Sequence, residues 1–150
     1  MTSFNIFTQR DSNLAMDINT RYEVESLYIK LGKLSDQFNG ELSDLFTEDG
    51  EYLYGTDAVT GRAAIAEHIQ SLAGVTTRHC VMNIDLNVTD GKVITATAVA
   101  MAMTNRNDST AIYVVDYESE FQRVKEKLLI RRHSVTIALS IAGADILGCE

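Results

Sequence analysis

The second half of the chain consists of long segments in which apolar and polar residues alternate, and this pattern limits the fold more than any other feature. The first segment runs from Thr76 to Thr89, and similar segments cover residues 93–104, 111–123 and 128–139. A period of two is typical of β-strands. The Asp90-Gly91 pair after the first segment favours a tight hairpin turn, because such turns need positive φ angles. The four segments therefore predict an antiparallel meander.

Helical patterns fill most of the first half. Thr20 and Glu23 have the spacing of a capping box, which predicts that a helix begins at Thr20. After it, apolar residues recur at spacings of three and four, as on one face of an amphipathic helix: Val24, Leu27, Tyr28, Leu31, Leu34 and Phe38. A shorter helix near 42–46, a short strand at 51–54 and a third helix between Gly61 and Gly74 follow.

This order of elements indicates an α+β fold and not a parallel doubly wound sheet. The predicted strands are longer than usual, and long strands in a twisted sheet curl. We therefore expect three N-terminal helices packed on a strongly curved, mainly antiparallel sheet that forms a cone with an interior pocket. The chain has 150 residues, no proline and no linker-like stretch, so we predict one domain over 1–150, with a core at about 20–139 and tails at 1–17 and 140–150.

Charge and cysteine content narrow the partners and the compartment. The formal net charge is −8, so phosphate backbones and anionic lipid heads repel the chain. We therefore predict neither a nucleic-acid partner nor a membrane partner, and no apolar stretch approaches the length of about 18 residues that a membrane span needs. Cys80 lies in a strand pattern and Cys149 in the tail. No disulfide is expected between them, and two free thiols suit the cytoplasm.

Three short motifs resemble a known family. They are Phe-Thr-Glu-Asp at 46–49, Gly-Arg-Ala-Ala-Ile at 61–65 and Thr-Arg-His at 77–79. In sequence and spacing they resemble signatures of the SnoaL-like branch of the nuclear transport factor 2-like superfamily. The resemblance covers residues 20–139 and implies a pocket-forming fold and a homodimer, since the outer face of the sheet is a common interface in this class. The superfamily includes isomerases, dehydratases, cyclases and proteins without chemistry, so the fold does not fix the function.

His79 and Tyr28 are the first candidates for chemistry. In dehydratase-like relatives the histidine that matches His79 points into the pocket as a general acid/base, and a neutral imidazole can take or give a proton near pH 7. The alternative is that His79 and Arg78 brace the sheet through hydrogen bonds. Tyr28 lies near the position of a tyrosine that donates to a developing oxyanion in ketosteroid isomerase-like relatives. Its alternative is a core tyrosine with a satisfied hydroxyl.

The sequence departs from the family pattern at two carboxylates. Tyr54, which shares a strand face with Tyr52, stands where steroid isomerase-like members carry a proton-abstracting aspartate. Tyrosine, with an ordinary pKa near 10, is a poor base at neutral pH, which argues against that reaction. Gly32 stands where the dehydratases carry an aspartate, and Asp36 nearby is predicted to face away from the apolar stripe. The segment 93–104 also contains no second pocket histidine.

Two further polar residues have alternative interpretations. Asp116, Glu118 and Glu120 share one face of the predicted strand, a pattern that marks solvent, although Asp116 would replace the missing acid if that face lined the cone. His68 lies on the apolar side of the third helix, as a satisfied core histidine or as a polar group at the pocket mouth.

The remaining strand residues concern the pocket and the dimer. Val81 shares a strand face with His79 and is placed with Tyr52 in the pocket. Met101 and Met103 would suit a deformable apolar pocket, with ordinary core as the alternative. Alanines at every second position over 96–102 would allow close helix packing or a contact between two sheets. His133 belongs to the last strand, where members of the family that the chain resembles usually carry a basic residue. The plainer interpretation is a histidine on a sheet face in a dimer interface.

No cofactor and no metal ion are predicted, because the phosphate-binding and dinucleotide motifs are missing and the histidines at 68, 79 and 133 have no ligand spacing. Two hypotheses from different classes remain. The first is a cofactor-free isomerase, dehydratase or cyclase that acts on a small, mostly apolar molecule, with His79 as acid/base and Tyr28 or Tyr54 polarising an oxygen. The second is a non-catalytic module that binds a small ligand or serves as a dimerisation unit.

Overall fold

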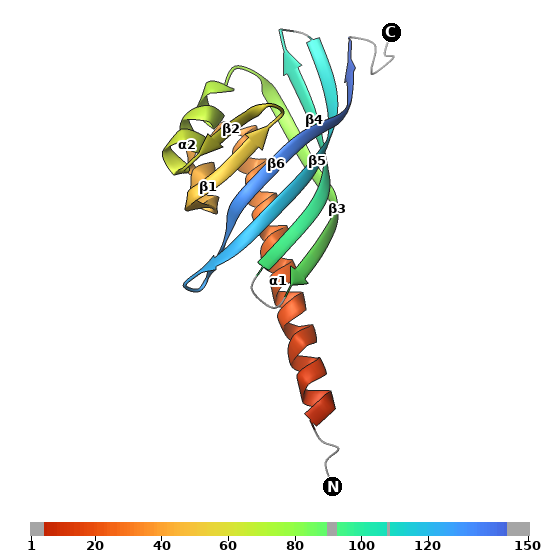
Figure 1. The fold of residues 1–150 in the computed structure, drawn as a ribbon. Helices are drawn as coiled ribbons and strands as arrows, with labels where there is room; N and C mark the ends of the chain where they lie inside the picture. The colour runs from red at the N-terminus through yellow and green to blue at the C-terminus, as the bar shows by residue number, and fades with distance from the viewer. Residues whose placement is uncertain (1–4, 90–92, 108, 144–150) are drawn as a thin grey trace.

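The computed structural model describes residues 5–89, 93–107 and 109–143. It contains two α-helices, a 3-10 helix and six strands (Figure 1). In chain order these are α1 (Asn5–Asp36), η1 (Gly40–Leu45), β1 (Phe46–Tyr54), β2 (Asp57–Thr60), α2 (Arg62–Ser71), β3 (Thr76–Thr89), β4 (Val93–Arg106), β5 (Ser109–Val124) and β6 (Lys127–Ala142).

The strands form one mixed sheet in the order β2-β1-β6-β5-β4-β3. The meander β3 to β6 is antiparallel, as predicted, and β1 joins it by pairing parallel with β6. The long strands twist and curve, with α1 against the sheet and α2 beside β1 and β2 (Figure 1). The α+β class is therefore confirmed. The predicted Asp90-Gly91 turn lies outside the described residues.

Helix α1 begins earlier than the capping box predicted. It starts at Asn5 and runs through Thr20, whose side chain is buried, so the assignment of Thr20 as N-cap is wrong. No proline or glycine occurs between Asn5 and Thr20 to interrupt the helix. The predicted tails are correspondingly shorter, because α1 covers 5–17 and β6 continues to Ala142.

The sequence motifs at 46–49 and 61–65 meet in space and hold β1 to α2. The Arg62 guanidinium donates to the Phe46 carbonyl from Nε at 2.9 Å and from Nη2 at 2.7 Å, and Nη1 pairs with Glu48 at 3.1 Å. The Gly61 amide donates to the Gly50 carbonyl at 2.8 Å. These contacts therefore hold the start of α2 against β1. Strand β2, which the sequence analysis missed, follows β1 after a turn at Gly55, where φ is +59°.

A β-bulge divides the inner face of β3. The register with β4 shifts between Met82 and Asp85, and Asn83 has a φ of +53°. One extra residue reverses the alternation beyond it. Cys80 and Met82 consequently lie on the exposed side, while Ile84 packs against the core. The apolar residues at every second position from Cys80 to Val88, which simple alternation would put on one face, are therefore divided between the two faces of β3.

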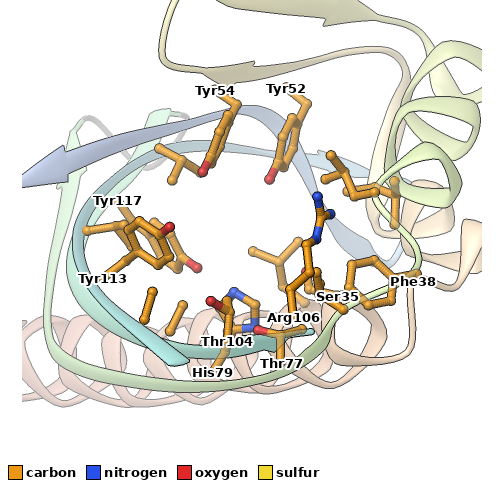
Figure 2. Close-up of a pocket in the computed structure, with 18 of the residues that line it drawn as sticks. Ser35, Phe38, Tyr52, Tyr54, Thr77, His79, Thr104, Arg106, Tyr113 and Tyr117 are labelled. Atoms are coloured by element: carbon orange, nitrogen blue, oxygen red, sulfur yellow. The ribbon is translucent and has the colours of Figure 1, made fainter. Parts of the chain in front are cut away.

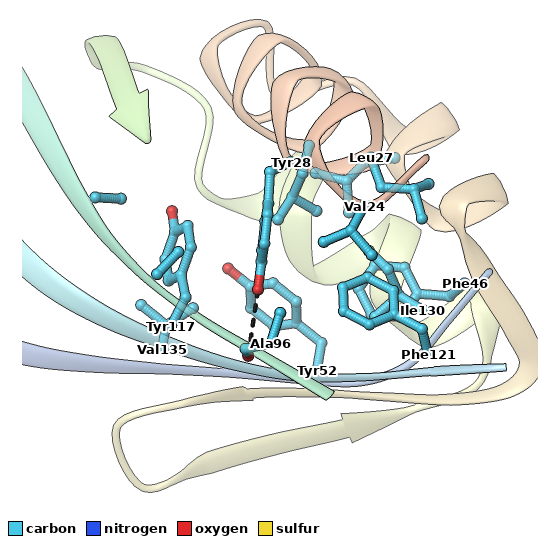
Figure 3. Close-up of a cluster of buried hydrophobic side chains, with 14 of the residues drawn as sticks. Val24, Leu27, Tyr28, Phe46, Tyr52, Ala96, Tyr117, Phe121, Ile130 and Val135 are labelled. Carbon is cyan, nitrogen blue, oxygen red and sulfur yellow. Dashed lines mark hydrogen bonds between the residues drawn. The ribbon is translucent and has the colours of Figure 1, made fainter. Parts of the chain in front are cut away.

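The core lies between α1 and the inner face of the sheet. Val24, Tyr28 and Leu31 on α1 pack in one cluster with side chains of β4, β5 and β6 (Figure 3). Ala96, Ala98 and Ala100 belong to this cluster, so the alanine strip serves packing within the chain and not a contact between two sheets. Burial of each large apolar side chain contributes roughly 1.5–3 kcal/mol.

Candidate active site

A cavity of about 550 Å³ lies between the inner face of the sheet, the end of α1 and α2. Its walls come from side chains of α1, α2 and all the strands except β2 (Figure 2). This volume falls within the range of roughly 300–1,000 Å³ that is usual for small-molecule sites.

The cavity floor follows the cross-strand pairs of β3, β4 and β5. His79 pairs with Ala102, which in turn pairs with Tyr113, and all three line the cavity. Thr77 and Thr104 form the next pair that faces the cavity. The inner face of β4 is therefore apolar at its buried alanines and becomes polar toward Thr104 and Arg106 at the end of the strand.

His79 is held by a carboxylate from α1. Its Nδ1 lies 2.7 Å from Oδ1 of Asp36, and its backbone amide lies 3.4 Å from Oδ2 of the same side chain. The two side chains are 18% and 15% exposed. The prediction that Asp36 faces away is wrong, because Asp36 follows Tyr28 and Gly32 at spacings of four residues and so stays on the buried side of the helix.

The Asp36 contact determines which ring nitrogen of His79 can react. An ionised carboxylate only accepts hydrogen bonds, so Nδ1 of His79 carries the proton. Nε2 of the neutral ring then keeps its lone pair, and the ring lines the cavity (Figure 2). Gly32 lies against the same histidine, since a Cβ built on Gly32 would be 3.5 Å from Cβ of His79. Asp36, one helical turn after Gly32, supplies the carboxylate on α1.

Four tyrosines line the cavity, and their hydroxyl groups point into it: Tyr52, Tyr54, Tyr113 and Tyr117 (Figure 2). Desolvation by burial raises the pKa of Tyr52, of Tyr117 and, to a smaller extent, of Tyr54. The phenols of Tyr52, Tyr54 and Tyr117 therefore stay protonated at neutral pH and are hydrogen-bond donors for an oxygen or a halide in the cavity.

A buried polar chain joins the cavity wall to the core. The Tyr28 hydroxyl donates to Oγ of Ser119 at 3.0 Å, and Oγ of Ser119 lies 2.8 Å from Nδ1 of His133. His133 lines the cavity with only 1% of its surface exposed, and desolvation by burial lowers its pKa to about 3. His133 is therefore neutral and lies inside the fold, not on a dimer surface as predicted.

The structure brings only some of the predicted site residues to the cavity. His79, Tyr52 and Tyr54 line it. Tyr28 is fully buried in the core, 6.0 Å from the ring of Phe121, and its hydroxyl is also 3.4 Å from the Ala96 carbonyl (Figure 3). Asp116 is exposed on the other face of β5 from the buried Val115 and Tyr117.

The remaining pocket candidates do not line the cavity either. Met101 and Met103 lie on the opposite face of β4 from the cavity-lining Ala102, and Val81 packs against the core. The ring of His68 lies 5.7 Å from the ring of Tyr52, which lines the cavity. Its Nε2 is buried without a hydrogen-bond partner among the described residues.

Sequence reasoning missed Asp36, His133, Tyr113, Tyr117 and Arg106. A usable signal existed for Tyr113 and Tyr117, which alternate with the carboxylates of β5 and so had to face inward once those carboxylates faced solvent. Asp36 and His133 needed the helix phase and the strand register, and Arg106 needed a longer β4.

Neither a metal-ligand cluster nor a membrane-spanning helix occurs in the described part of the chain. Within 5–89, 93–107 and 109–143, no three histidine, cysteine, aspartate or glutamate side chains gather to hold a metal ion. No helix within these ranges has the length and apolar character to cross a membrane.

The chain matches a family model in sequence and several solved structures in fold. A family model described as a SnoaL-like domain matches residues 16–134. A search of curated proteins finds no match. Solved structures with the same fold include an NTF2-like protein with a cystatin-like fold from Novosphingobium aromaticivorans, at 24% identity and a TM-score of 0.77, covering 91% of this chain and 92% of the other.

Two further solved structures resemble the chain. Hexachlorocyclohexane dehydrochlorinase LinA-type3 from Novosphingobium barchaimii is 14% identical, with a TM-score of 0.79 and coverage of 87% of this chain and 94% of the other. ActVI-ORFA from Streptomyces coelicolor is 23% identical, with a TM-score of 0.70 and coverage of 80% and 98%. At these identities the likeness shows the fold alone.

Proposed function

We propose that this chain, which belongs to the SnoaL-like family of the nuclear transport factor 2-like superfamily, is a cofactor-free lyase or isomerase that removes a proton from carbon. The observation that carries the proposal is the Asp36–His79 pair, with 2.7 Å between Oδ1 and Nδ1, on the wall of a cavity of about 550 Å³. The cavity is proposed as the substrate chamber of the cone.

His79 is the general base in this proposal. Asp36 fixes the tautomer and the ring orientation, and it stabilises the imidazolium that forms when Nε2 takes a proton. Asp36 is thus a positioning residue. A positioned general base contributes roughly 10²–10⁴-fold to a rate.

The tyrosine hydroxyls would stabilise the negative charge that develops when the proton leaves the carbon. Removal of a proton from carbon leaves an electron pair that must move to an electronegative atom. The phenols of Tyr54 and Tyr113 would donate to a carbonyl oxygen that becomes an enolate, or to a hydroxyl or halide that departs. Return of the proton from His79 to another carbon completes an isomerisation, whereas departure of the leaving group completes an elimination. The name of the dehydrochlorinase neighbour indicates an elimination on this fold.

Hydrogen exchange next to a carbonyl reports the proposed proton removal directly, because the enolate takes up deuterium when it returns to the ketone. Cyclic ketones and β-hydroxyketones of one to three rings, each with and without a ring carboxylate, are incubated with the protein in D₂O, and NMR follows deuterium incorporation next to the carbonyl. We expect protein-dependent exchange in the wild type and a loss of roughly 10²–10⁴-fold in His79→Asn. Asp36→Asn should lose part of the rate, because the tautomer is no longer fixed.

Tyr28→Phe is the matched control, since Tyr28 is buried outside the cavity. Exchange that persists in a folded His79→Asn protein would refute the role of His79. Compounds that bind in the cavity but show no exchange in the wild type would contradict the proposed chemistry and favour a non-catalytic binding module.

A further inference from the structure

One end of the cavity differs from the rest because a positively charged side chain lines it. Arg106 at the end of β4 lines the cavity and is exposed, which places it at the opening. Its guanidinium points into the space enclosed by the lining side chains (Figure 2). Among the described residues that line the cavity, Arg106 is the one arginine or lysine.

Hydroxyl groups accompany this cation. Ser109 pairs with Arg106 across β4 and β5, and Thr77 pairs with Thr104 one step further in. All four residues line the cavity. Thr77 is 4% exposed, and its Oγ1 is buried without a hydrogen-bond partner among the described residues. A buried hydroxyl without a partner costs free energy, and a bound polar group would remove that cost.

We propose that this end of the cavity is an anion subsite, in which Arg106 and the Thr77 hydroxyl receive a carboxylate of the substrate. The planar guanidinium presents paired N–H donors that match the two oxygens of a carboxylate. The inference rests on the proposed binding of a small molecule in the cavity, and it changes the expected substrate. The substrate is an organic acid with an apolar ring body, and not a neutral apolar molecule.

The spacing of the two ends limits the size of this acid. Arg106 lies four residues along β4 from Ala102, the partner of His79, which corresponds to roughly 13 Å of strand. The Arg106 side chain extends back into the cavity and shortens this span. A body of one or two rings would then place its carboxylate at Arg106 and its reacting carbon at His79.

Electrostatics gives the subsite a second role. The chain has a net charge of −8, so the protein as a whole repels anionic ligands. A cation at the opening lowers this barrier locally and selects acids over neutral molecules of the same shape. Salt screens such an exposed charge, so the preference for an acid should weaken as ionic strength rises.

Binding of a matched pair of probes tests the subsite. 2-Naphthoate and 2-naphthamide have nearly the same shape, and only the first carries a charge. Isothermal titration calorimetry at low salt should give a Kd for naphthoate about tenfold lower than that for naphthamide. Arg106→Gln should remove the difference, and Arg106→Lys should keep part of it, because lysine retains the charge but not the planar fork.

Two further variants make the result specific. Arg131→Gln removes an exposed arginine that pairs with Glu120 on the sheet, and it should leave the preference intact. His79→Asn should also leave it intact, so failure of the proposed chemistry and failure of the subsite are distinguishable. Equal affinity of the wild type for the two probes, no binding of either at millimolar concentration, or an unchanged preference in Arg106→Gln would overturn the subsite.

Discussion

His133 should make the free energy of unfolding fall at low pH, and His133→Gln should remove the part of this fall that the histidine causes. The ring is buried, its Nδ1 is bonded to Ser119 at 2.8 Å, and burial lowers its pKa from 6.5 to about 3. In the unfolded chain the same histidine has its ordinary pKa. Between these two values the unfolded state binds a proton that the native state does not, so stability falls as the pH falls.

The size of the effect follows from the gap between the two pKa values. Each pH unit below the unfolded value costs about 1.4 kcal/mol until the native pKa is reached. At pH 4.5, about two units below the ordinary pKa, His133 should cost about 3 kcal/mol relative to pH 8. Carboxylates also affect acid stability, but they are the same in the two proteins.

Urea unfolding of the wild type and His133→Gln at pH 8, 6.5, 5.5 and 4.5 measures the difference. The variant is expected to lose stability at all pH values because its packing changes, and only the change with pH concerns the histidine. Plotted against pH, the free energies of unfolding of the wild type and of the variant give two curves, and the gap between them should narrow by about 3 kcal/mol from pH 8 to 4.5. Parallel curves would refute the reasoning, as would NMR evidence that native His133 takes up a proton near pH 6.

Three further predictions concern single substitutions. Tyr28→Phe should lower the free energy of unfolding by about 1 kcal/mol through loss of the bond to Ser119, with hydrogen exchange of substrate unchanged; a large loss of exchange would restore Tyr28 as a catalytic residue. Ser119→Ala should cost about 1–3 kcal/mol in urea unfolding, because Tyr28 and His133 both lose a buried partner, and a cost below that of Tyr28→Phe would contradict the chain of bonds. Gly32→Ala should raise the free energy of unfolding by about 0.5–1 kcal/mol, because the new Cβ fits against His79. Gly50→Ala should lower the free energy of unfolding by about 1–3 kcal/mol, because the new Cβ would lie 2.9 Å from Cβ of Phe46. Changes in the same direction for the two variants would refute this contrast.

The positions of the strands could be predicted from the sequence because alternation is a local property. The predicted segment 76–89 coincides with β3, and the other three differ from β4, β5 and β6 by a few residues at their ends. His79 was also found from the sequence, through the motif at 77–79. These features depend on neighbours in the chain, so a single sequence contains the information.

The direction of individual side chains could not be predicted in the same way. The bulge at Asn83 reverses the faces of β3, and nothing in the alternation of Cys80, Met82 and Ile84 marks it. A shift of one residue moves every following side chain to the other face. A prediction of faces is therefore correct only as far as the first irregularity.

The sequence by itself determined the α+β class, the four strands of the meander, the family and one catalytic candidate, because each follows from short-range patterns. Only the tertiary structure decided that Asp36 bonds to His79, that His133 is buried and that Arg106 stands at the cavity opening. Each of these depends on the angular phase of a helix or the register of paired strands, since these settle which residues from distant parts of the chain face one cavity.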